Sequence, residues 1–588
     1  MTYESDTAQR LRRRILCAQG QDACDLVLRN ARIFNVFTKS FVDHADVAVV
    51  DGVIVEAGAR TAVRGLREID LDNALLVPGF IDAHVHIESS MLRPSEFARL
   101  ILSKGTTSII ADPHEIANVC GLDGIRFMLE DAKRAVVDIG FMLPSCVPAT
   151  PFETAGARLE AHDLAPLMSE PSVLGLAEVM NVPALLAGDE DTLRKLVLAH
   201  RAGKCIDGHA PFLSGAGLSA YAAAGVRSDH EGSTAEEAAE HIARGITVFM
   251  REGSVGRNVE ALSKAVTRDN SAMFCLCSDD SGCDDVSRRG HINHVVRRAV
   301  ACGVPAQEAL CMATINPARH FGLRNKGAIA PGRLADLVVI DNLTDFNVLD
   351  VYKSGVRLKD LPEASDIALP AAVASRVRIK PIARDALRLR CPSARARVIG
   401  CTAGNLVTQS LVRAVSIDSE GFVKLDDTPE LLKLAVVERH RATGNIGLGL
   451  VQGLLREGAR MRGAIATTIA HDSHNIVVAG DNDADMIAAV ETLEAFGGGV
   501  VLVRDGVAVQ SLRLEIAGLM TAARAQEVVR AKSQLVEAAH RDFGFAEDEH
   551  PILALSFLAL PVIPSLRLTD RGLFDVSSFS HVRLEAAA

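Results

Sequence analysis

Residues 78–90 read PGFIDAHVHIESS, an apolar run that carries two histidines, one residue apart, close to its end. Side chains alternate between the two faces of a β-strand, so Asp82, His84 and His86 share one face of the strand predicted here. Two imidazoles on one face can bind a single divalent cation. Histidines hydrogen-bonded within a core would give the same local pattern, so this stretch alone leaves both interpretations open.

Seven further apolar segments follow this one, and amphipathic stretches such as PSEFARLILSKG and TAEEAAEHIARG separate them. This alternation over residues 73–280 predicts an α/β fold, a (β/α)8 TIM-like barrel. The predicted strands are 75–86, 106–114, 136–147, 173–181, 204–211, 225–232, 246–254 and 272–280.

Polar residues gather at the carboxyl ends of these predicted strands, where (β/α)8 barrels keep their active sites. Their imidazoles and carboxylates are enough to hold two divalent cations with open positions, whereas a closed zinc site uses four thiolate or imidazole ligands. Nitrogen and oxygen donors without sulfur suit Zn²⁺, Fe²⁺ or Mn²⁺, and the residues do not choose among the three. The set is His84, His86, Asp112, His114, Glu178, His209, His230, Glu252 and Asp279.

Two β-rich pieces flank the predicted barrel, and a further segment follows them. The similar texture of residues 25–58 and 326–356 predicts one small β-sandwich built from both sides of the barrel. The last segment combines strand-rich and helical patterns and is expected to form a separate α+β domain. The predicted division is 1–74 and 326–384 for the small β domain, 75–325 for the barrel and 385–588 for the C-terminal α+β domain.

Composition narrows the classes of function. A formal net charge of −11 argues against nucleic-acid binding, which needs a surplus of Lys and Arg on one face. The amino terminus has no apolar stretch long enough for a signal peptide or a membrane helix. We therefore expect a cytoplasmic protein with a small-molecule substrate, without nucleic-acid or membrane partners, and forming a homo-oligomer, a dimer or larger.

Several competing motifs fail on inspection. HIE at 86–88 matches the H-x-E of zinc nucleobase deaminases, but their P-C-x-x-C partner is missing. HEIAN at 114–118 and HEGST at 230–234 lack the second histidine of a HExxH protease helix. GLGLVQG at 447–453 has no dinucleotide-binding context.

The pattern of HxH on the first strand, glutamate on the fourth, histidines on the fifth and sixth and aspartate on the eighth resembles the amidohydrolase superfamily. Longer strings narrow the resemblance to the bacterial adenine deaminases within it. These strings include PGFIDAHVHIESSM, ADPHEIANVCG, GLAEVMN, DGHAP, LCSDD, GHINHVVRRA, TTIAHDSHNIVV and LPVIPSLRLTDRGLFD. They run from before residue 80 to beyond 570, so the resemblance covers nearly the whole chain.

The resemblance implies hydrolytic deamination of adenine to hypoxanthine and ammonia by a metal-activated hydroxide, in purine salvage. It favours Mn²⁺ or Fe²⁺ over Zn²⁺ as the two divalent ions. Asp279 would also accept the proton of the nucleophile, and Glu88 is the candidate for delivering a proton to the ring or to departing ammonia. The implied metal ligands are His84, His86, Glu178, His209, His230 and Asp279, with Glu178 as the candidate bridge.

The expected substrate-binding residues come from three places in the chain, namely Ser89 and Ser90, Asp112 and His114, and His471 and His474. The last two belong to HDSHN at 471–475, which is a loop folding over the barrel mouth, a surface turn or part of an internal hydrogen-bond network. Asp112 and His114 are either substrate contacts or partners of the metal ligands.

Two alternative functions remain. One is a metal hydrolase of the same barrel class that acts on a cyclic amide or an N-acyl amino acid. Many such enzymes carry a carboxylated lysine on the fourth strand, and Glu178 at this position argues against them. The other is a non-catalytic metal-binding or oligomeric scaffold, which a complete ligand set beside acid groups argues against.

Overall fold

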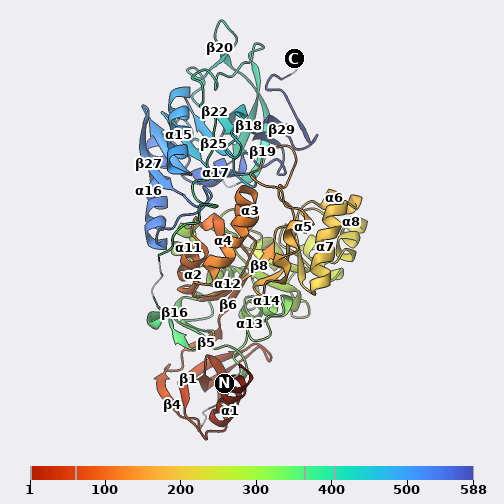
Figure 1. The fold of residues 1–588 in the computed structure, drawn as a ribbon, viewed down its shortest axis with the longest axis vertical. Coiled ribbons are helices and arrows are strands. Elements are labelled where there is room, and N and C mark those ends of the chain that lie inside the picture. The colour runs from red at the N-terminus through yellow and green to blue at the C-terminus, as the bar shows by residue number, and fades with distance from the viewer. Residues whose placement is uncertain (1–2, 60–61, 363–365, 403–404, 587–588) are drawn as a thin grey trace.

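A computed structural model describes residues 3–59, 62–362, 366–402 and 405–586. Three bodies follow one another along the long axis of the molecule (Figure 1). A small sheet domain lies at the end that carries the N-terminus, the curled parallel sheet and its helices lie in the middle, and the C-terminal domain lies at the other end. Among the described residues, no helix has both the length and the apolar character needed to cross a membrane.

The middle body is a TIM-like barrel sheet, and each of the eight predicted strand segments contains one of its strands. One group of parallel strands has the order β10-β9-β8-β7-β6-β14, and a second has the order β11-β12-β13. Chain continuity from β13 to β14 and a backbone hydrogen bond of 3.0 Å from Arg227 N to Ile206 O connect the two groups. The strands are β6 (Phe80–His86), β7 (Thr106–Ala111), β8 (Asp138–Leu143), β9 (Val173–Val179), β10 (Cys205–Gly208), β11 (Ser228–Asp229), β12 (Thr247–Arg251), β13 (Phe274–Cys277) and β14 (Asp279–Asp280).

The helices around this sheet carry the expected local signals. Helix α9 begins with a capping box in which Thr234 and Glu237 each accept the other's backbone N–H. Helix α7 begins at an Asp189 cap and ends at Gly203 in the left-handed conformation. The main helices are α2 (Pro94–Leu102), α3 (His114–Cys120), α4 (Leu122–Ala132), α7 (Glu190–Ala202), α8 (Gly215–Ala223), α9 (Ala235–Ala243), α10 (Val259–Ser263), α11 (Cys283–Arg289), α12 (Ile292–Ala301), α13 (Ala306–Met312) and α14 (Ile315–His320).

The first predicted strand, 75–86, is in fact two strands that belong to different sheets. β5 (Leu75–Pro78) pairs with strands of the small domain, and β6 begins the barrel sheet. Gly79 is the residue between the two strands. Only glycine fits there, because a Cβ would lie 2.2 Å from the hydroxyl oxygen of Thr107. The unbroken apolar run gave no sign of this division.

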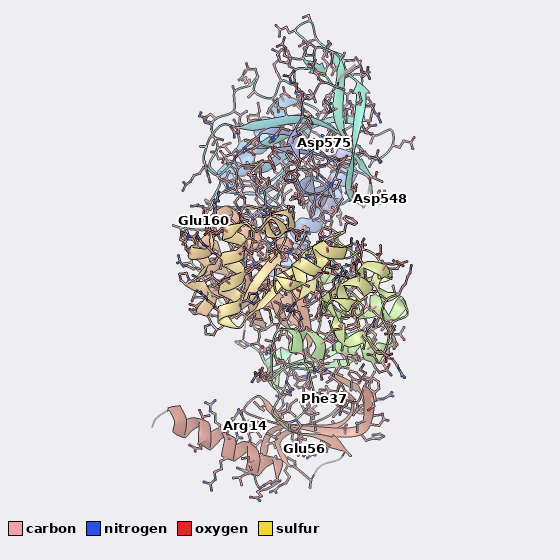
Figure 2. The ribbon with its side chains drawn as sticks, turned by 90° about the vertical axis from the view of Figure 1, so that its right-hand side faces the viewer. Arg14, Phe37, Glu56, Glu160, Asp548 and Asp575 are labelled. Atoms are coloured by element: carbon pink, nitrogen blue, oxygen red, sulfur yellow. The ribbon has the colours of Figure 1, made fainter. Side chains whose placement is uncertain are left out.

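The small domain unites segments from before and after the barrel, as the sequence predicts. Its sheet has the order β17-β16-β15-β5-β1-β2-β3, and β4 pairs with β1. This pairing describes one sheet, so the two-sheet sandwich stays a prediction. The strands are β1 (Cys24–Asn35), β2 (Ser40–Val50), β3 (Val53–Ala59), β4 (Gly65–Asp70), β15 (Leu337–Ile340), β16 (Val348–Lys353) and β17 (Val356–Arg357), and α1 (Tyr3–Ala18) lies beside them (Figure 2).

The C-terminal domain is a separate, sheet-rich unit with the strand order β19-β18-β23-β22-β25-β24-β26-β27. Helix α15 (Asp483–Phe496) packs apolar side chains onto this sheet. Helix α16 (Ala525–Phe543) reaches the barrel, where Lys532 Nζ lies 2.6 Å from a carboxylate oxygen of Asp284 on α11. The strands are β18 (Arg395–Thr402), β19 (Asn405–Ala414), β22 (Leu431–Val437), β23 (Ile446–Gln452), β24 (Ala464–Thr467), β25 (Ile476–Gly480), β26 (Gly499–Arg504) and β27 (Val507–Arg513).

Candidate active site

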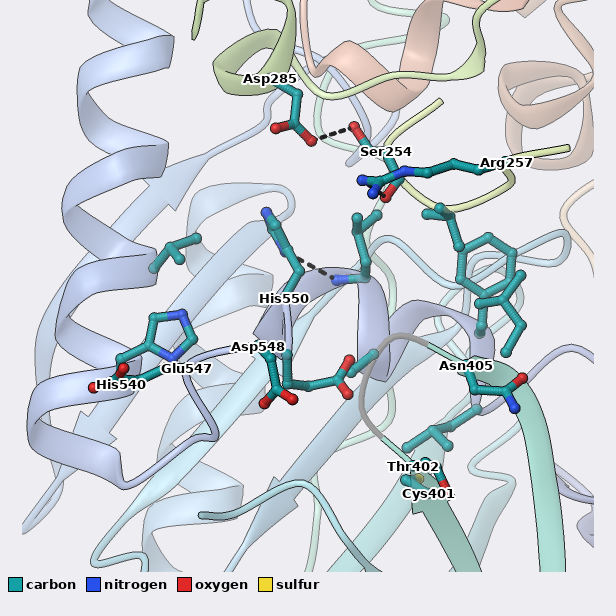
Figure 3. A pocket seen from close by; sticks show the side chains of 18 of the residues that line it. Ser254, Arg257, Asp285, Cys401, Thr402, Asn405, His540, Glu547, Asp548 and His550 are labelled. Carbon is teal, nitrogen blue, oxygen red and sulfur yellow. Dashed lines mark hydrogen bonds between the residues drawn. The ribbon is translucent and has the colours of Figure 1, made fainter. Parts of the chain in front are cut away.

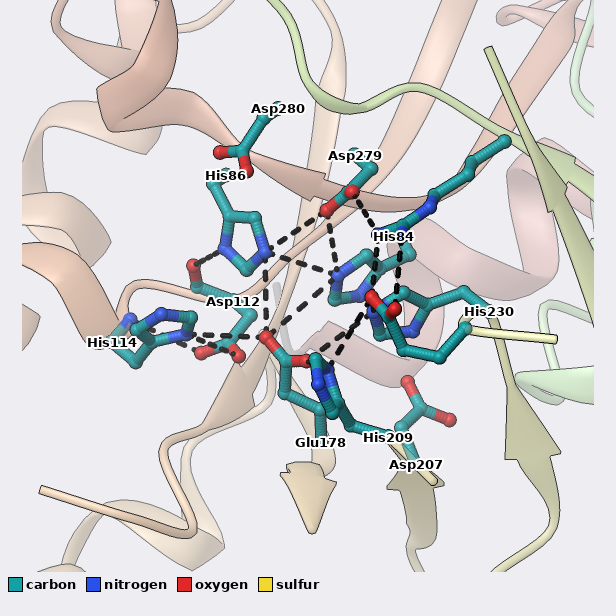
Figure 4. Close-up of polar contacts among 12 residues, drawn as sticks. His84, His86, Asp112, His114, Glu178, Asp207, His209, His230, Asp279 and Asp280 are labelled. Carbon is teal, nitrogen blue, oxygen red and sulfur yellow. Dashed lines mark hydrogen bonds and ion pairs between the residues drawn. The ribbon is translucent and has the colours of Figure 1, made fainter. Parts of the chain in front are cut away.

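The ends of the barrel strands bring all six predicted metal ligands together (Figure 4). His84 and His86 leave β6 on the same face, and their Nε2 atoms lie 3.1 Å apart. The ring of His230, at the end of β11, stacks on that of His84 with a centroid distance of 4.2 Å. Five of the six side chains are almost completely buried, and His209 is partly exposed.

Glu178, at the end of β9, faces two groups of imidazoles with its two oxygens. Its Oε1 atom lies 3.4 Å from Nε2 of His86 and 4.0 Å from Nε2 of His84. Its Oε2 atom lies 2.6 Å from Nδ1 of His209 and 3.3 Å from Nε2 of His230. This division between two carboxylate oxygens is the arrangement that a ligand shared by two cations requires.

Asp279 completes the first group of ligands from β14. Its Oδ1 atom lies 3.5 Å from Nε2 of His84 and 3.2 Å from Nε2 of His86, while Oδ2 lies 2.6 Å from a guanidinium nitrogen of Arg251. Its backbone φ is 53°, a left-handed value that aspartate tolerates better than most residues. Burial would raise the pKa of Asp279, but the charge of Arg251 and the contacts with His84 and His86 together outweigh it and hold the pKa well below its usual range.

Asp82 shares the strand face of the two histidines, but it serves the sheet rather than the ligand cluster. Its carboxylate accepts hydrogen bonds from the backbone N–H of Ser278, at 3.0 Å, and from the hydroxyl of the same residue. Ser278 is the residue between β13 and β14. Asp82 therefore fixes the break in the chain that places Asp279 at the metal ligands.

The donor set fits divalent cations on chemical grounds. Nδ1 of His86 lies 3.2 Å from the backbone oxygen of Asp112, so this nitrogen carries the proton and Nε2 presents its lone pair. That lone pair faces Nε2 of His84 and two carboxylate oxygens, one from Glu178 and one from Asp279. Carboxylates gathered around imidazole nitrogens are stabilised by cations. Nitrogen and oxygen ligands without sulfur suit Mn²⁺, Fe²⁺ or Zn²⁺.

Glu88, the candidate proton carrier, is buried in the short helical turn after β6. Its Oε1 atom accepts the backbone N–H of Ile116 at 3.1 Å, whereas Oε2 has no hydrogen-bond partner among the described residues. Burial, assisted by the nearby charge of Glu115, raises the pKa of Glu88 to about 7. The free oxygen is therefore available to carry a proton.

The two serines of the IESS turn have different surroundings. The hydroxyl of Ser89 donates to the carboxylate of Asp280, beside the metal ligands. The hydroxyl of Ser90 donates to the backbone oxygen of Ile87 at 2.6 Å and accepts the backbone N–H of Leu92 at 3.1 Å. The hydroxyl of Ser90 therefore forms its hydrogen bonds within the turn, and of the two serines Ser89 is the one that contacts a residue next to Asp279.

Asp112 and His114, at the end of β7, form a pair beside Glu178. Nδ1 of His114 lies 2.9 Å from Oδ2 of Asp112 and 3.4 Å from Oε1 of Glu178. Both side chains are buried. The structure therefore brings both residues to the edge of the ligand cluster.

The HDSHN segment does reach the barrel. It forms the turn between β24 and β25, and both His471 and His474 form hydrogen bonds with Glu115 on α3. The side chain of Asn475 donates to the backbone oxygen of Thr154 at 2.9 Å, which ties the turn to a barrel loop. A surface turn is excluded, since all five residues of the segment are buried, whereas these hydrogen bonds agree with the expected internal hydrogen-bond network.

Three residues of the site were not predicted. Glu231 follows His230 and places Oε1 3.5 Å from its Nε2, and Arg251 binds both Glu231 and Asp279 at 2.6 Å. Glu115 receives the HDSHN segment. The alternation of side chains along β12 could have predicted Arg251 as a site residue, because Arg251 ends this strand and faces inward. The next residue, the predicted Glu252, turns away and lies 3.4 Å from Arg298.

A cavity of about 550 Å³ lies between the barrel and the C-terminal domain (Figure 3). Its lining includes Ser254, Asp285, His550 and Phe557. The backbone N–H of Ser254 donates to the backbone oxygen of Asp280 at 2.8 Å, next to the metal ligands. Ser254 therefore links the lining of the cavity to Asp280, although none of the six predicted ligands is part of that lining.

A TIM-like barrel with this ligand cluster at its strand ends defines the amidohydrolase class, and the amidohydrolase family matches residues 75–358. The adenine deaminase C-terminal domain matches residues 405–580. The chain is 48% identical over 573 residues to the adenine deaminase of Nitratidesulfovibrio vulgaris (strain DP4), covering 96% of this chain and 97% of the relative. It is 44% identical over 569 residues to that of Clostridium acetobutylicum, covering 96% and 98%. The chain belongs to the adenine deaminase family.

Proposed function

We propose that this protein hydrolyses adenine to hypoxanthine and ammonia. The observation that carries the proposal is the cluster in which Glu178 turns one oxygen to His86 and the other to His209. Membership of the adenine deaminase family over nearly the whole chain, including the C-terminal domain, supplies the substrate.

The cations would be held by the six residues that the strand ends bring together. Glu178 would serve both ions, and Asp279 would complete the group formed with His84 and His86. Bound Mn²⁺ or Fe²⁺, with Zn²⁺ as the third candidate, supplies water whose pKa is lowered toward neutrality. The full proposed set is His84, His86, Glu178, His209, His230 and Asp279.

The acid–base residues are Asp279 and Glu88. Oδ1 of Asp279 accepts a proton from the attacking water, while Arg251 holds Oδ2 and fixes the orientation of the carboxylate. Glu88 donates a proton from its unpartnered Oε2 to the ring or to the departing amino group. Addition of water at C6 and loss of ammonia balance the reaction, because one proton of water ends on the ring nitrogen and the other on the departing ammonia. Asp279 passes on the proton that it accepted, and the C6 hydroxyl returns a proton to Glu88 as the carbonyl forms.

The purine would lie between these groups and the C-terminal domain. Ser89, Asp112, His114 and His471 border that space, whereas the hydrogen bonds of Ser90 and His474 are already satisfied. The cytoplasmic location, the role in purine salvage, the homo-oligomer and the domain boundaries at residues 74, 325 and 384 remain predictions.

Ammonia release tests this function directly. The Mn²⁺-loaded protein is incubated with adenine, other 6-aminopurines, cytosine and a cyclic amide, and ammonia and hydrolysed amide are both measured. We expect ammonia from adenine and none from cytosine. Amide hydrolysis without ammonia from adenine would instead place the protein with the cyclic amide hydrolases.

A further inference from the structure

A buried group of three side chains joins the barrel to the C-terminal domain next to the metal ligands. Glu115 from α3 uses its two carboxylate oxygens separately, Oε1 for Nδ1 of His471 and Oε2 for Nε2 of His474. All three side chains are at most 5% exposed. We call this group the Glu115 clamp, and it connects residues more than 350 positions apart in the sequence.

His474 has both ring nitrogens occupied. The backbone N–H of Ala470 donates to its Nδ1 atom at 3.1 Å, so Nδ1 carries a lone pair and the proton lies on Nε2. Nε2–H therefore donates to Glu115. Neither nitrogen is left for a substrate, and the protonated Nε2 cannot ligate a cation, although two histidines and a glutamate are otherwise a common ligand set.

His471 differs because only one of its nitrogens is used. Its Nδ1 side faces Glu115, one face of its ring stacks on Phe557 at a centroid distance of 4.6 Å, and Nε2 has no partner among the described residues. Burial lowers the pKa of His471, but the charge of Glu115, aided by Asp280 and Asp472, outweighs it and raises the pKa to about 9. Both ring nitrogens therefore carry protons at neutral pH.

The residues around His471 connect it both to the predicted metal ligands and to the cavity. Asp280, whose charge acts on His471, follows the metal ligand Asp279 and accepts the hydroxyl of Ser89. Phe557, on which the ring of His471 stacks, lines the cavity of about 550 Å³. One imidazole also separates the clamp from the bridging ligand, because His114 lies 3.4 Å from both Glu115 and Glu178.

We propose that Glu115 is a positioning residue that directs the Nε2–H of His471 at a ring nitrogen of the bound purine. The C-terminal domain thereby supplies a hydrogen-bond donor to the active site, and His474 holds Glu115 in place. Purine ring nitrogens without hydrogen are acceptors, so a charged N–H donor suits them. This inference rests on the proposed deamination of adenine and deepens it.

The test compares His471→Phe with wild type in KM and kcat for adenine and in the Kd of hypoxanthine by calorimetry. Phenylalanine keeps the stacking on Phe557 and removes the donor. We expect both KM and Kd to rise about 10- to 100-fold, the loss typical of a hydrogen bond from a charged donor. His471→Gln serves as a second variant should the first fail to fold, and His162→Gln, at an exposed histidine, is the matched control.

Glu115→Gln tests the positioning role. Loss of the carboxylate charge should raise the Kd of hypoxanthine at least 5-fold, while the bound Mn²⁺ stays at the wild-type ratio. A Kd within twofold of wild type in His471→Phe overturns the proposal. So does a cation equivalent present in the wild type and missing from Glu115→Gln, because the clamp would then be a metal site.

The two proposals fail in distinguishable ways. Ammonia release by the wild type reads out the proposed function alone, whereas the ratio of hypoxanthine affinities between wild type and His471→Phe reads out the clamp. A wild type that deaminates adenine but binds hypoxanthine no better than His471→Phe refutes only the clamp. A wild type that neither deaminates adenine nor binds hypoxanthine refutes both.

Discussion

Two buried clusters of histidine and carboxylate lie side by side in this molecule and behave as opposites. In the metal ligand cluster, His84 and His86 point imidazole nitrogens at one another and at carboxylate oxygens, with few donors present. In the Glu115 clamp, each carboxylate oxygen has its own histidine, and a backbone N–H fixes the tautomer of His474. The residue types are the same in both clusters.

Hydrogen-bond partners, rather than residue types, therefore distinguish a cation site from a structural contact between two domains. Buried polar atoms need partners. The ligand set around the two histidines of β6 gathers groups that could hold a metal ion, and we expect a cation there. Around Glu115 the protein supplies a histidine for each carboxylate oxygen, so these oxygens need no cation.

Removal of divalent cations should separate the two clusters most strongly. Chelation followed by dialysis is expected to abolish ammonia release, and Mn²⁺ should restore it at two ions per chain, because the ligand cluster depends on cations. Metal analysis and activity are measured on the same samples. Full activity in a protein shown to be free of metal would contradict the interpretation of the ligand cluster.

Asp279→Asn should lower kcat by about 10²- to 10⁴-fold, the range for loss of an acid–base group. The amide retains size and one acceptor oxygen but cannot take the proton. Asp269→Asn, at an exposed aspartate, is the matched control. Near-normal turnover by Asp279→Asn, with metal content unchanged, would remove this residue from the proposed role.

Glu88→Gln should lower kcat by about 100-fold, at the lower end of that range, because glutamine cannot release a proton. The hydrogen bond from Ile116 to Oε1 should persist, so the turn should remain folded. Thermal unfolding and turnover are compared with Glu130→Gln, at an exposed glutamate on α4. If turnover stays within twofold of wild type, another group delivers the proton.

The pH dependence of kcat/KM should show the titration of His471 in the Glu115 clamp. The raised pKa of His471, about 9, means that the charged ring is the form below this pH and is lost as the pH rises through 9. The remaining proton then stays on Nδ1 facing Glu115, and Nε2 ceases to be a donor. We expect an approximately 10-fold fall in kcat/KM above pH 9 in wild type. The same fall in His471→Phe would assign it to another group.

The smallest effects should come from the serines of the IESS turn. Ser89→Ala removes the hydrogen bond to Asp280 and should raise KM about fivefold, equivalent to about 1 kcal/mol. Ser90→Ala should leave KM within twofold and instead cost about 1 kcal/mol of stability, since its hydroxyl serves the turn. Equal KM effects in the two variants would show that the turn rearranges when substrate binds.

Sequence patterns predicted the middle of the molecule well because they record local physics. The period of two along PGFIDAHVHIESS places His84 and His86 on one face, and parallel strands bring their carboxyl ends to one edge. That reasoning is enough to gather Glu178, His209 and Asp279 around them. It failed at Gly79, where the run passes from one sheet to another without a change in hydrophobicity.

The eight-strand alternation, the ligand types and the family could all be predicted from residue patterns along the chain. Only the tertiary structure decided that Glu178 divides its oxygens between two groups of imidazoles, that Arg251 rather than Glu252 faces inward, and that the HDSHN turn closes on Glu115. These outcomes depend on the packing of whole elements and on pairing between residues hundreds of positions apart. No local pattern encodes such distances, because the chain between the two partners can be arranged in many ways until the core forms.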